Sequence, residues 1–262
     1  MSSAEPEVST APAEQETSDD GLRSMSFLDH LDELRRRLTW SLVAVIVAFL
    51  ACWSFAPQIF AIIEQPLIQV LEPGEKLAYT RLTAPFFLYM KVAFFSAIFV
   101  ASPFVLTQLW LFISPGLYPR ERRYALPFIF FASIFFIGGG YFGYKVVFPM
   151  ACGFFVEMGR NFQQVITVDD YFAFASKLII AMGLVFETPI LIFFLSRLGI
   201  VTPQFLMKNF KYAIVATFII AAVITPTPDV VTQSALAIPM ILLYLLGVLV
   251  AYVFGAPRQK DE

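Results

Sequence analysis

The chain has 262 residues, of which 58% are hydrophobic and 15% are charged, and its mean hydropathy is +0.74. Few soluble folds could bury that much apolar surface, so the composition argues against a soluble protein and favours one that crosses a membrane several times. The 18 basic residues are balanced by 20 acidic ones, which argues against nucleic acid as a partner. The composition therefore predicts an all-α integral membrane protein.

The first 26 residues are rich in Ser, Glu, Ala and Pro and show no apolar periodicity. Such a segment cannot bury enough apolar surface to offset the entropy of ordering, so residues 1–26 are predicted to form a disordered acidic tail. The segment has neither the basic start nor the apolar core of a cleavable signal peptide, so the first span is expected to act as its own insertion signal.

The stretch FLDHLDELRRRL, residues 27–38, repeats Phe and Leu at three- and four-residue spacing, which predicts an amphipathic helix. This helix is expected to lie along the inner membrane surface before it turns into the first span. Its arginines can be explained as topology anchors alone. Acidic residues contribute little to topology, so Asp32 and Glu33 need a further reason.

Six apolar segments, each bounded by Pro, Gly or charge clusters, predict six transmembrane helices. The predicted spans are residues 38–55, 84–113, 124–148, 171–195, 212–224 and 235–254. Basic residues gather before the first span, in two alternate loops and after the sixth span, so both termini are expected in the cytoplasm. Residues 27–256 then form one membrane domain, followed by a short cytoplasmic tail at 257–262.

The fifth span, residues 212–224, is short, because as a helix it would rise only about 20 Å against a hydrocarbon core of roughly 30 Å. It must therefore thin the bilayer, tilt little or be sheltered by neighbouring helices; a short re-entrant element is the alternative interpretation. Pro103 and the Gly138–Gly140 run, in the second and third spans, are expected to allow bending or close helix approach.

The two cysteines, Cys52 and Cys152, match no metal-ligand spacing. Both are expected toward the outer face, so a disulfide is conceivable, but two unpaired thiols in apolar surroundings are the favoured interpretation. The sequence contains no nucleotide-binding loop and no Ser/His/Asp arrangement, and its one histidine, His30, precedes the first span on an expected solvated surface. We therefore predict no catalytic residues, no metal and no cofactor.

The stretch SPGLYPRERRY, residues 114–124, places Glu121 among three arginines in a predicted cytoplasmic loop. A tight loop whose glutamate balances its neighbours is one interpretation. The other is that Glu121 and Glu33 together form a site for a cationic peptide. Carboxylates suit arginine there, because the planar guanidinium donates two parallel hydrogen bonds that lysine cannot copy.

The stretch GLVFETPILIFF, residues 183–194, places Glu187 inside an otherwise apolar run. An ionised acid at the centre of a bilayer costs about 2.5–3.5 kcal/mol on insertion scales. Pro189 frees a backbone carbonyl upstream, so the helix is predicted to bend close to the acid. A structural glutamic acid bonded to a neighbouring helix is one interpretation, but acids inside membranes generally mark functional sites.

Taken together, these stretches resemble the TatC family, the multi-spanning component of the twin-arginine protein translocase. The resemblance covers residues 27–254 and rests on HLDELRRRL, QLWLFISPGLYPRERR, FETP, TPTPDVVTQ and LAIPM, in that order along the chain. It implies six helices in a concave, glove-like bundle with short fifth and sixth helices. It also implies a place in the bacterial cytoplasmic (inner) membrane.

The same resemblance implies a receptor rather than an enzyme. Such a receptor binds the twin-arginine signal peptides of folded proteins, assembles with TatA- and TatB-type single-span subunits and with further copies of itself, and uses the proton-motive force for export. The implied peptide-binding residues are Glu33, Arg35, Phe112, Glu121, Arg122 and Arg123. The implied residues of an intramembrane polar site for a partner helix are Glu187 and Gln233, and the implied outer-loop positions are Pro66 and Asp229.

Individual residues also suggest two other functions. A proton-coupled permease for a small solute would use Glu187 as its proton carrier. The internal repeat common in such transporters is not evident, and the carboxylate–arginine clusters favour a peptide receptor. An intramembrane enzyme would need a nucleophile–base pair or a metal-ligand set, and the sequence offers neither.

Overall fold

The computed structural model describes residues 27–71, 76–113, 125–162, 165–225 and 230–254, and these ranges are almost entirely helical. The predicted tails at 1–26 and 257–262, and the predicted site residues Glu121, Arg122, Arg123 and Asp229, lie outside the described residues. The helices are α1 (Phe27–Trp53), α2 (Ala56–Ile68), α3 (Ala84–Ile113), α4 (Ala125–Phe142), the π-helical segment η3 (Gly143–Val147), α5 (Phe148–Met158), α6 (Val168–Phe186), α7 (Thr188–Arg197), α8 (Pro203–Lys208), α9 (Phe210–Ile224) and α10 (Val230–Phe254).

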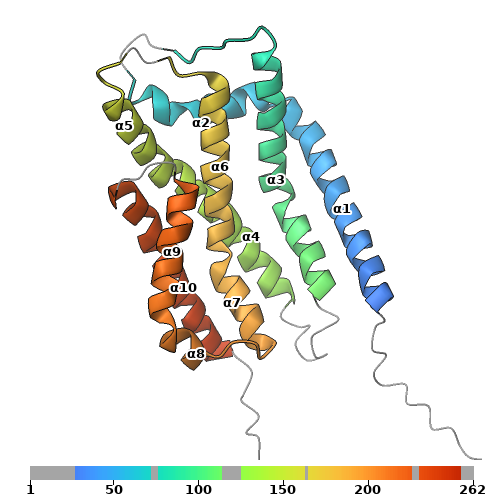
Figure 1. Cartoon of the computed structure of the whole chain (residues 1–262). Coiled ribbons are helices and arrows are strands. Elements are labelled where there is room, and N and C mark those ends of the chain that lie inside the picture. Colours follow the sequence, from blue (N-terminus) through green and yellow to red (C-terminus); the bar gives the residue numbers. More distant parts are fainter. Residues whose placement is uncertain (1–26, 72–75, 114–124, 163–164, 226–229, 255–262) are drawn as a thin grey trace, which may run out of the picture.

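The long helices run side by side between two ends of a bundle (Figure 1). We call the end at which α1 begins and α10 finishes the lower end, and the opposite end, which α2 crosses, the upper end. Within the described ranges, five helical segments are long and apolar enough to cross a membrane: His30–Trp53, Ala84–Ile113, Pro127–Met158, Val168–Arg197 and Thr232–Val253. The sixth predicted span corresponds to α10, and the fifth to the shorter apolar helix α9, of 15 residues.

Three element boundaries differ from the sequence prediction. The amphipathic stretch 27–38 does not turn into the first span but continues it as one helix, α1, because nothing in it breaks the helical pattern. The predicted first outer loop contains a helix, α2, with Pro66 buried inside it. The sixth helix is not short: α10 has 25 residues, since it begins at Val230, well before the predicted residue 235.

Glycine brings α4 and α6 into close contact. A Cβ atom built on Gly139 would lie 2.6 Å from Cβ of Phe186 and 2.7 Å from the Met182 carbonyl oxygen. One built on Gly183, in α6, would lie 3.2 Å from the backbone carbonyl oxygen of Phe136. The predicted close helix approach at the glycine run is therefore confirmed for Gly139, whereas Gly138 faces open space.

Hydroxyl groups compensate for three helical prolines, each of which lacks the N–H that would bond to the carbonyl four residues earlier. For Pro103 that carbonyl belongs to Phe99, and it accepts a 2.8 Å hydrogen bond from the Ser102 hydroxyl. For Pro189 it belongs to Val185, which accepts a 2.6 Å bond from Thr188. The chain can therefore bend within the membrane without leaving these carbonyls unsatisfied.

The third compensated proline, Pro66, ties α2 to the rest of the bundle. The hydroxyl of Tyr144 donates to the Ile62 carbonyl oxygen, four residues before Pro66, at 2.7 Å. The hydroxyl of Tyr171 donates to the next carbonyl, that of Ile63, also at 2.7 Å. Two hydrogen bonds from η3 and α6 thus fasten the helix that crosses the upper end.

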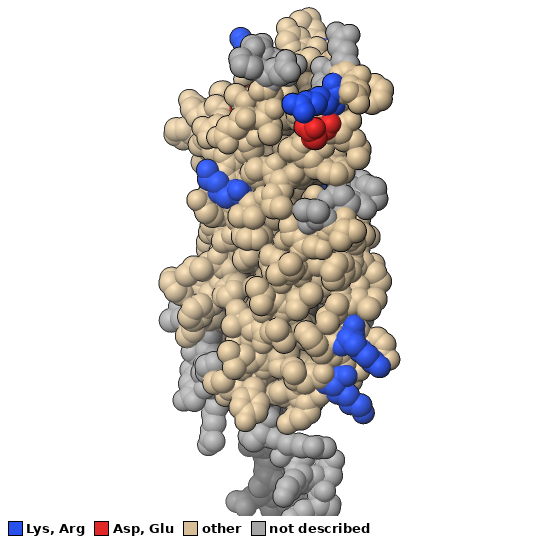
Figure 2. Space-filling view, turned by 90° about the vertical axis from the view of Figure 1, so that its left-hand side faces the viewer, with Lys and Arg blue, Asp and Glu red and all other residues tan. Residues whose placement is uncertain are grey.

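The main hydrophobic core joins α1, α2, α3, η3, α5, α6, α9 and α10. Cys52 and Cys152 are both buried in this core and both carry free thiols, as the favoured interpretation of the sequence predicted. The outer surface is also apolar, as a membrane-embedded protein requires: Figure 2 shows a face whose middle band is uncharged, with Lys and Arg side chains gathered above and below it.

Candidate functional site

The best-defined polar contact at the lower end joins α1 to α3. Arg37 donates from Nε to Oε1 of Glu33 at 2.7 Å, across one helical turn of α1. The same guanidinium donates to Oε1 of Gln108, on α3, at 3.3 Å. Only 20% of the Arg37 side chain and 17% of the Glu33 side chain are exposed, so the lower end holds a largely shielded carboxylate whose orientation is set by two helices.

An aromatic pair lies one turn below this contact. The rings of His30 and Phe112 are stacked, with centroids 4.5 Å apart and planes inclined by 25°. His30 precedes Glu33 by three residues and Phe112 follows Gln108 by four, so each pair of residues shares a helix face. The predicted solvated histidine is exposed, but it also packs against a predicted site residue.

The predicted site residues are therefore only partly brought together. Glu33 and Phe112 lie in successive layers between α1 and α3, whereas Arg35 is exposed and its carbonyl oxygen accepts a hydrogen bond from the Thr39 hydroxyl. The sequence reasoning did not assign Arg37 or Gln108 to the site. The four-residue spacing of Glu33 and Arg37 is a signal that could have found the first, since opposite charges at that spacing pair on a helix.

A groove extends from this region along the bundle. One cavity of about 500 Å³ lies among α1, α3, α4 and the α6–α7 helix, and a second of about 680 Å³ lies among α1, α3 and α6. Val45 and Ile98 line both cavities, so the two adjoin along α1 and α3. The lining is almost wholly apolar, so the groove suits an apolar chain rather than a small polar solute.

Glu187 interrupts the apolar lining at the break between α6 and α7. Its backbone leaves the regular helix, with ψ at −7°, so the bend predicted from Pro189 is confirmed. The Oε1 atom of Glu187 is buried and accepts no hydrogen bond from any residue that the structure describes. A buried acceptor without a donor is costly, which makes this oxygen a candidate for a bond to a bound partner.

Gln233 does not complete that site. Its amide nitrogen donates a 2.9 Å hydrogen bond to the Phe218 carbonyl oxygen on α9, and the described residues show no hydrogen bond between Gln233 and Glu187. Gln233 thus links α9 to the upper part of α10. This amide bond is a polar contact between the short helix α9 and its neighbour α10.

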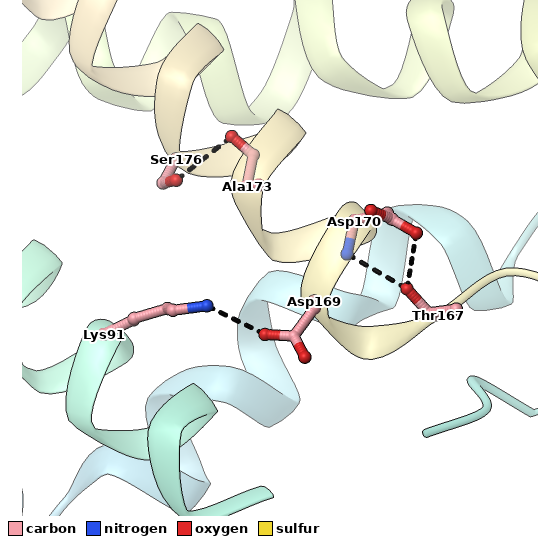
Figure 3. Close-up of polar contacts among 6 residues, drawn as sticks. All are labelled: Lys91, Thr167, Asp169, Asp170, Ala173 and Ser176. Atoms are coloured by element: carbon pink, nitrogen blue, oxygen red, sulfur yellow. Dashed lines mark hydrogen bonds and ion pairs between the residues drawn. The ribbon is translucent and has the colours of Figure 1, made fainter. Parts of the chain in front are cut away.

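An ion pair marks the upper end of the groove. Lys91, which lines the groove, lies 2.8 Å from Oδ1 of Asp169 at the start of α6 (Figure 3). The first turn of α6 is capped there: the Thr167 hydroxyl accepts from the Asp170 backbone N–H at 3.1 Å and donates to its carboxylate at 2.7 Å. Acids in a first turn also suit the helix dipole, so the start of α6 is fixed electrostatically.

These arrangements define what the molecule can bind. Among the residues described, no group of three His, Cys, Asp or Glu side chains could hold a metal ion. The polar groups instead suit recognition: Glu33 is linked through Arg37 to Gln108, next to Leu109 in the lining of the first cavity, and Glu187 lines the same cavity. The fold and the site together define a multi-pass membrane protein with an apolar groove among its long helices.

Comparison with known proteins identifies the family. The model of the TatC family, described as Sec-independent protein translocase protein (TatC), matches residues 29–239. The chain is 46% identical to the protein of that name from Koribacter versatilis, over 94% of this chain and 92% of the relative. It is 42% identical to the one from Desulforapulum autotrophicum, over 90% and 87% of the two chains.

A solved structure agrees with the sequence comparisons. A crystal structure of the twin arginine translocase receptor TatC is 34% identical and superposes with a TM-score of 0.73, covering 86% of this chain and 98% of that chain. The chain described here is therefore a transport subunit, a multi-pass inner-membrane component of a protein translocase. It belongs to the TatC family.

Proposed function

We propose that this chain is the receptor subunit that binds twin-arginine signal peptides of folded cargo at its lower end, which faces the cytoplasm. Both termini then lie in the cytoplasm, and the basic residues of the lower end satisfy the positive-inside rule. Glu33, Arg35, Phe112, Glu121, Arg122 and Arg123 form the peptide site in this proposal. Export draws on the proton-motive force.

One observation carries the proposal: Glu33 is a carboxylate whose orientation is set by two helices at the mouth of an apolar groove. Both contacts with Arg37 fall on Oε1, so Oε2 is open to a peptide guanidinium, which gains the full bidentate contact where it displaces Arg37 from Oε1. Phe112 provides an adjacent aromatic face on which a second guanidinium can stack. The apolar part of a signal peptide then follows the groove.

Glu187 serves a different partner in this proposal. Its buried oxygen accepts a hydrogen bond from a polar side chain on the single transmembrane helix of a TatA- or TatB-type subunit. Gln233, at the α9–α10 contact, belongs to the same assembly surface, and Pro66 and Asp229 act at the upper end. Contacts between copies of the chain complete the receptor complex.

The test is a binding titration of the detergent-solubilised protein with a synthetic twin-arginine signal peptide and a matched twin-lysine peptide. Loss of a bidentate arginine–carboxylate contact costs about 1.5–3 kcal/mol, so the arginine peptide should bind at least about tenfold more tightly. Glu33→Ala and Glu121→Ala should each remove most of this preference.

Asp32→Ala is the matched control, because Asp32 is an exposed acid on the neighbouring position of α1. It should leave the preference unchanged. Equal affinity for the two peptides in the unmodified protein would overturn the receptor proposal. For Glu187, co-purification of a TatA-type subunit with a Glu187→Ala variant should fall while peptide affinity stays the same.

A further inference from the structure

Two lysines occur within the membrane-crossing helices on exposed surface and without an acidic partner. Lys145 lies in η3 and Lys177 in α6, and both are exposed. No ion pair includes either of them in the described ranges, whereas Lys91, the third such lysine, is paired with Asp169. An ammonium group on a lipid-facing surface is stable only where its side chain reaches the polar layer of the bilayer.

The two lysines lie at the same height above the lower end. Lys145 is 20 residues after Ala125, where α4 begins (145 − 125), and Lys177 is 20 residues before Arg197, where α7 ends (197 − 177). At a rise of 1.5 Å per residue each distance is about 30 Å along its helix, which is comparable to the thickness of a typical hydrocarbon core. The helices continue beyond both lysines, so the bundle is longer than the bilayer.

Two further residues, Lys91 on α3 and Trp53 on α1, indicate a membrane boundary near the same level. Lys91 is 22 residues before Ile113 (113 − 91), or about 33 Å above the lower end of α3. Trp53, 37% exposed, ends α1 and lies 16 residues after Arg37 (53 − 37), or about 24 Å from it. Tryptophan concentrates at membrane interfaces, so a boundary at this height suits all four helices.

The distribution of charge supports this boundary. Below the level of the lysines, the described residues 38–53, 92–113, 125–144 and 178–196 contain one Asp, Glu, Lys or Arg, namely Glu187. Above it lie the Glu157–Arg160 ion pair, at the end of α5, and Asp169 at the start of α6, which pairs with Lys91 of α3. The uncharged band of Figure 2 shows the same division on one face.

We propose that Lys145 and Lys177 bind the phosphate groups of phospholipids in the upper leaflet and so fix the edge of the hydrocarbon core about 30 Å above the lower end. The upper third of the molecule, with α2, α5 and the start of α6, then stands in the headgroup layer and the water beyond it. This inference is independent of the peptide site, because none of the peptide-binding residues takes part.

The boundary is tested by thiol labelling in phosphatidylglycerol nanodiscs with a charged maleimide, which reaches both faces. The native thiols are buried, so the unmodified chain provides the blank. Met150→Cys and Ile137→Cys introduce thiols at positions that are 41% and 46% exposed, above and below Lys145. Since the reactive thiolate is excluded from hydrocarbon, the upper thiol should react at least about tenfold faster than the lower one. Protection of both thiols would place the boundary at the helix ends and overturn the proposal.

The role of the lysines is tested in the Met150→Cys background. Replacing both Lys145 and Lys177 by leucine should slow the labelling at least about fivefold, because hydrocarbon then covers residue 150, while two arginines should keep the rate. Native mass spectrometry should show fewer phosphatidylglycerol molecules retained by the leucine variant than by the arginine variant. Equal labelling and equal lipid retention in both variants would contradict the assignment.

A phosphate-free bilayer separates phosphate binding from simple hydration of the ammonium groups. In nanodiscs of a galactosyl diacylglycerol with the same acyl chains, the leucine substitutions should no longer change the labelling of residue 150. An unchanged effect of leucine in this glycolipid would show that water, not phosphate, accommodates the lysines, and would overturn the phosphate assignment.

Discussion

The two carboxylates of the groove are held in opposite ways. Glu33 is oriented by long polar side chains, Arg37 and Gln108, at the partly exposed lower end. Glu187 is positioned by the backbone itself, at a helix break beside the close contact of α4 and α6. Side-chain contacts can be exchanged for those of a ligand, whereas a backbone break cannot move without repacking the core. Substitutions near Glu33 should therefore change binding, and those near Glu187 should change stability.

The largest effect is expected from Gly139→Ala. The new methyl group would overlap with Phe186 and with the Met182 carbonyl oxygen, at 2.6 and 2.7 Å, so α4 must move away from α6. We expect a loss of about 1–3 kcal/mol in the free energy of unfolding, measured by chemical denaturation in detergent. Gly138→Ala is the control, since open space surrounds that position, and it should be neutral or stabilising. Equal destabilisation by both would remove the argument that packing holds the Glu187 region.

A smaller loss is expected from Thr188→Val. This change removes the hydroxyl that donates to the Val185 carbonyl oxygen, which receives no N–H from Pro189 and otherwise accepts a backbone N–H at the end of α6. The unfolding free energy should fall by about 1 kcal/mol, and Thr188→Ser should restore it. Ser133→Ala should have little effect, because the Ile129 carbonyl that Ser133 bonds keeps its ordinary helical N–H. A larger loss of unfolding free energy from Ser133→Ala than from Thr188→Val would mean that the proline is not what makes Thr188 important.

Arg37→Met tests how the other carboxylate, Glu33, is held. The substitution releases Oε1 of Glu33, so a twin-arginine peptide no longer competes with an internal guanidinium. A partly exposed ion pair contributes up to about 1 kcal/mol, which limits the expected gain in peptide affinity to about fivefold. The same titration with Arg37→Lys should show a smaller gain. A fall in affinity would show that Arg37 positions Glu33 rather than competes for it.

The smallest effect is expected outside both regions, at Glu64 on α2. Burial raises the pKa of this carboxyl, so ionising it costs more in the folded protein than in the unfolded chain. The cost is absent below the unfolded pKa of about 4.3 and fully present above the folded pKa. Glu64→Gln should therefore raise the melting temperature slightly at pH 7.5 and leave it unchanged near pH 4. A variant that is less stable at pH 7.5 would show that the carboxylate has a favourable partner.

Apolar length, Pro and Gly allowed the helical class, the bend at Glu187 and the close approach at Gly139 to be predicted from the sequence. The prediction of a turn at the end of the amphipathic stretch was wrong, because a helix can pass from an aqueous to an apolar surface without a break in its own hydrogen bonds. α2 was missed because an apolar helix of 13 residues is too short to be recognised as a span, and Pro66 interrupts its pattern.

For the candidate site, the sequence indicated Glu33, Phe112 and Glu187 but not Gln108 or the stacked His30. Those contacts depend on the register of α3 against α1, and that register is set by packing of side chains that lie many residues apart. The same limit applies to Gln233, whose bond to Phe218 depends on how far α10 extends beyond the short α9.

The two tyrosine hydrogen bonds to α2 have a mechanical consequence. α1 packs mainly on α3 and ends at α2, which Tyr144 and Tyr171 hold against η3 and α6. α1 is therefore joined to the bundle at both ends, through α2 at the upper end and through the Arg37–Gln108 and His30–Phe112 contacts with α3 at the lower end.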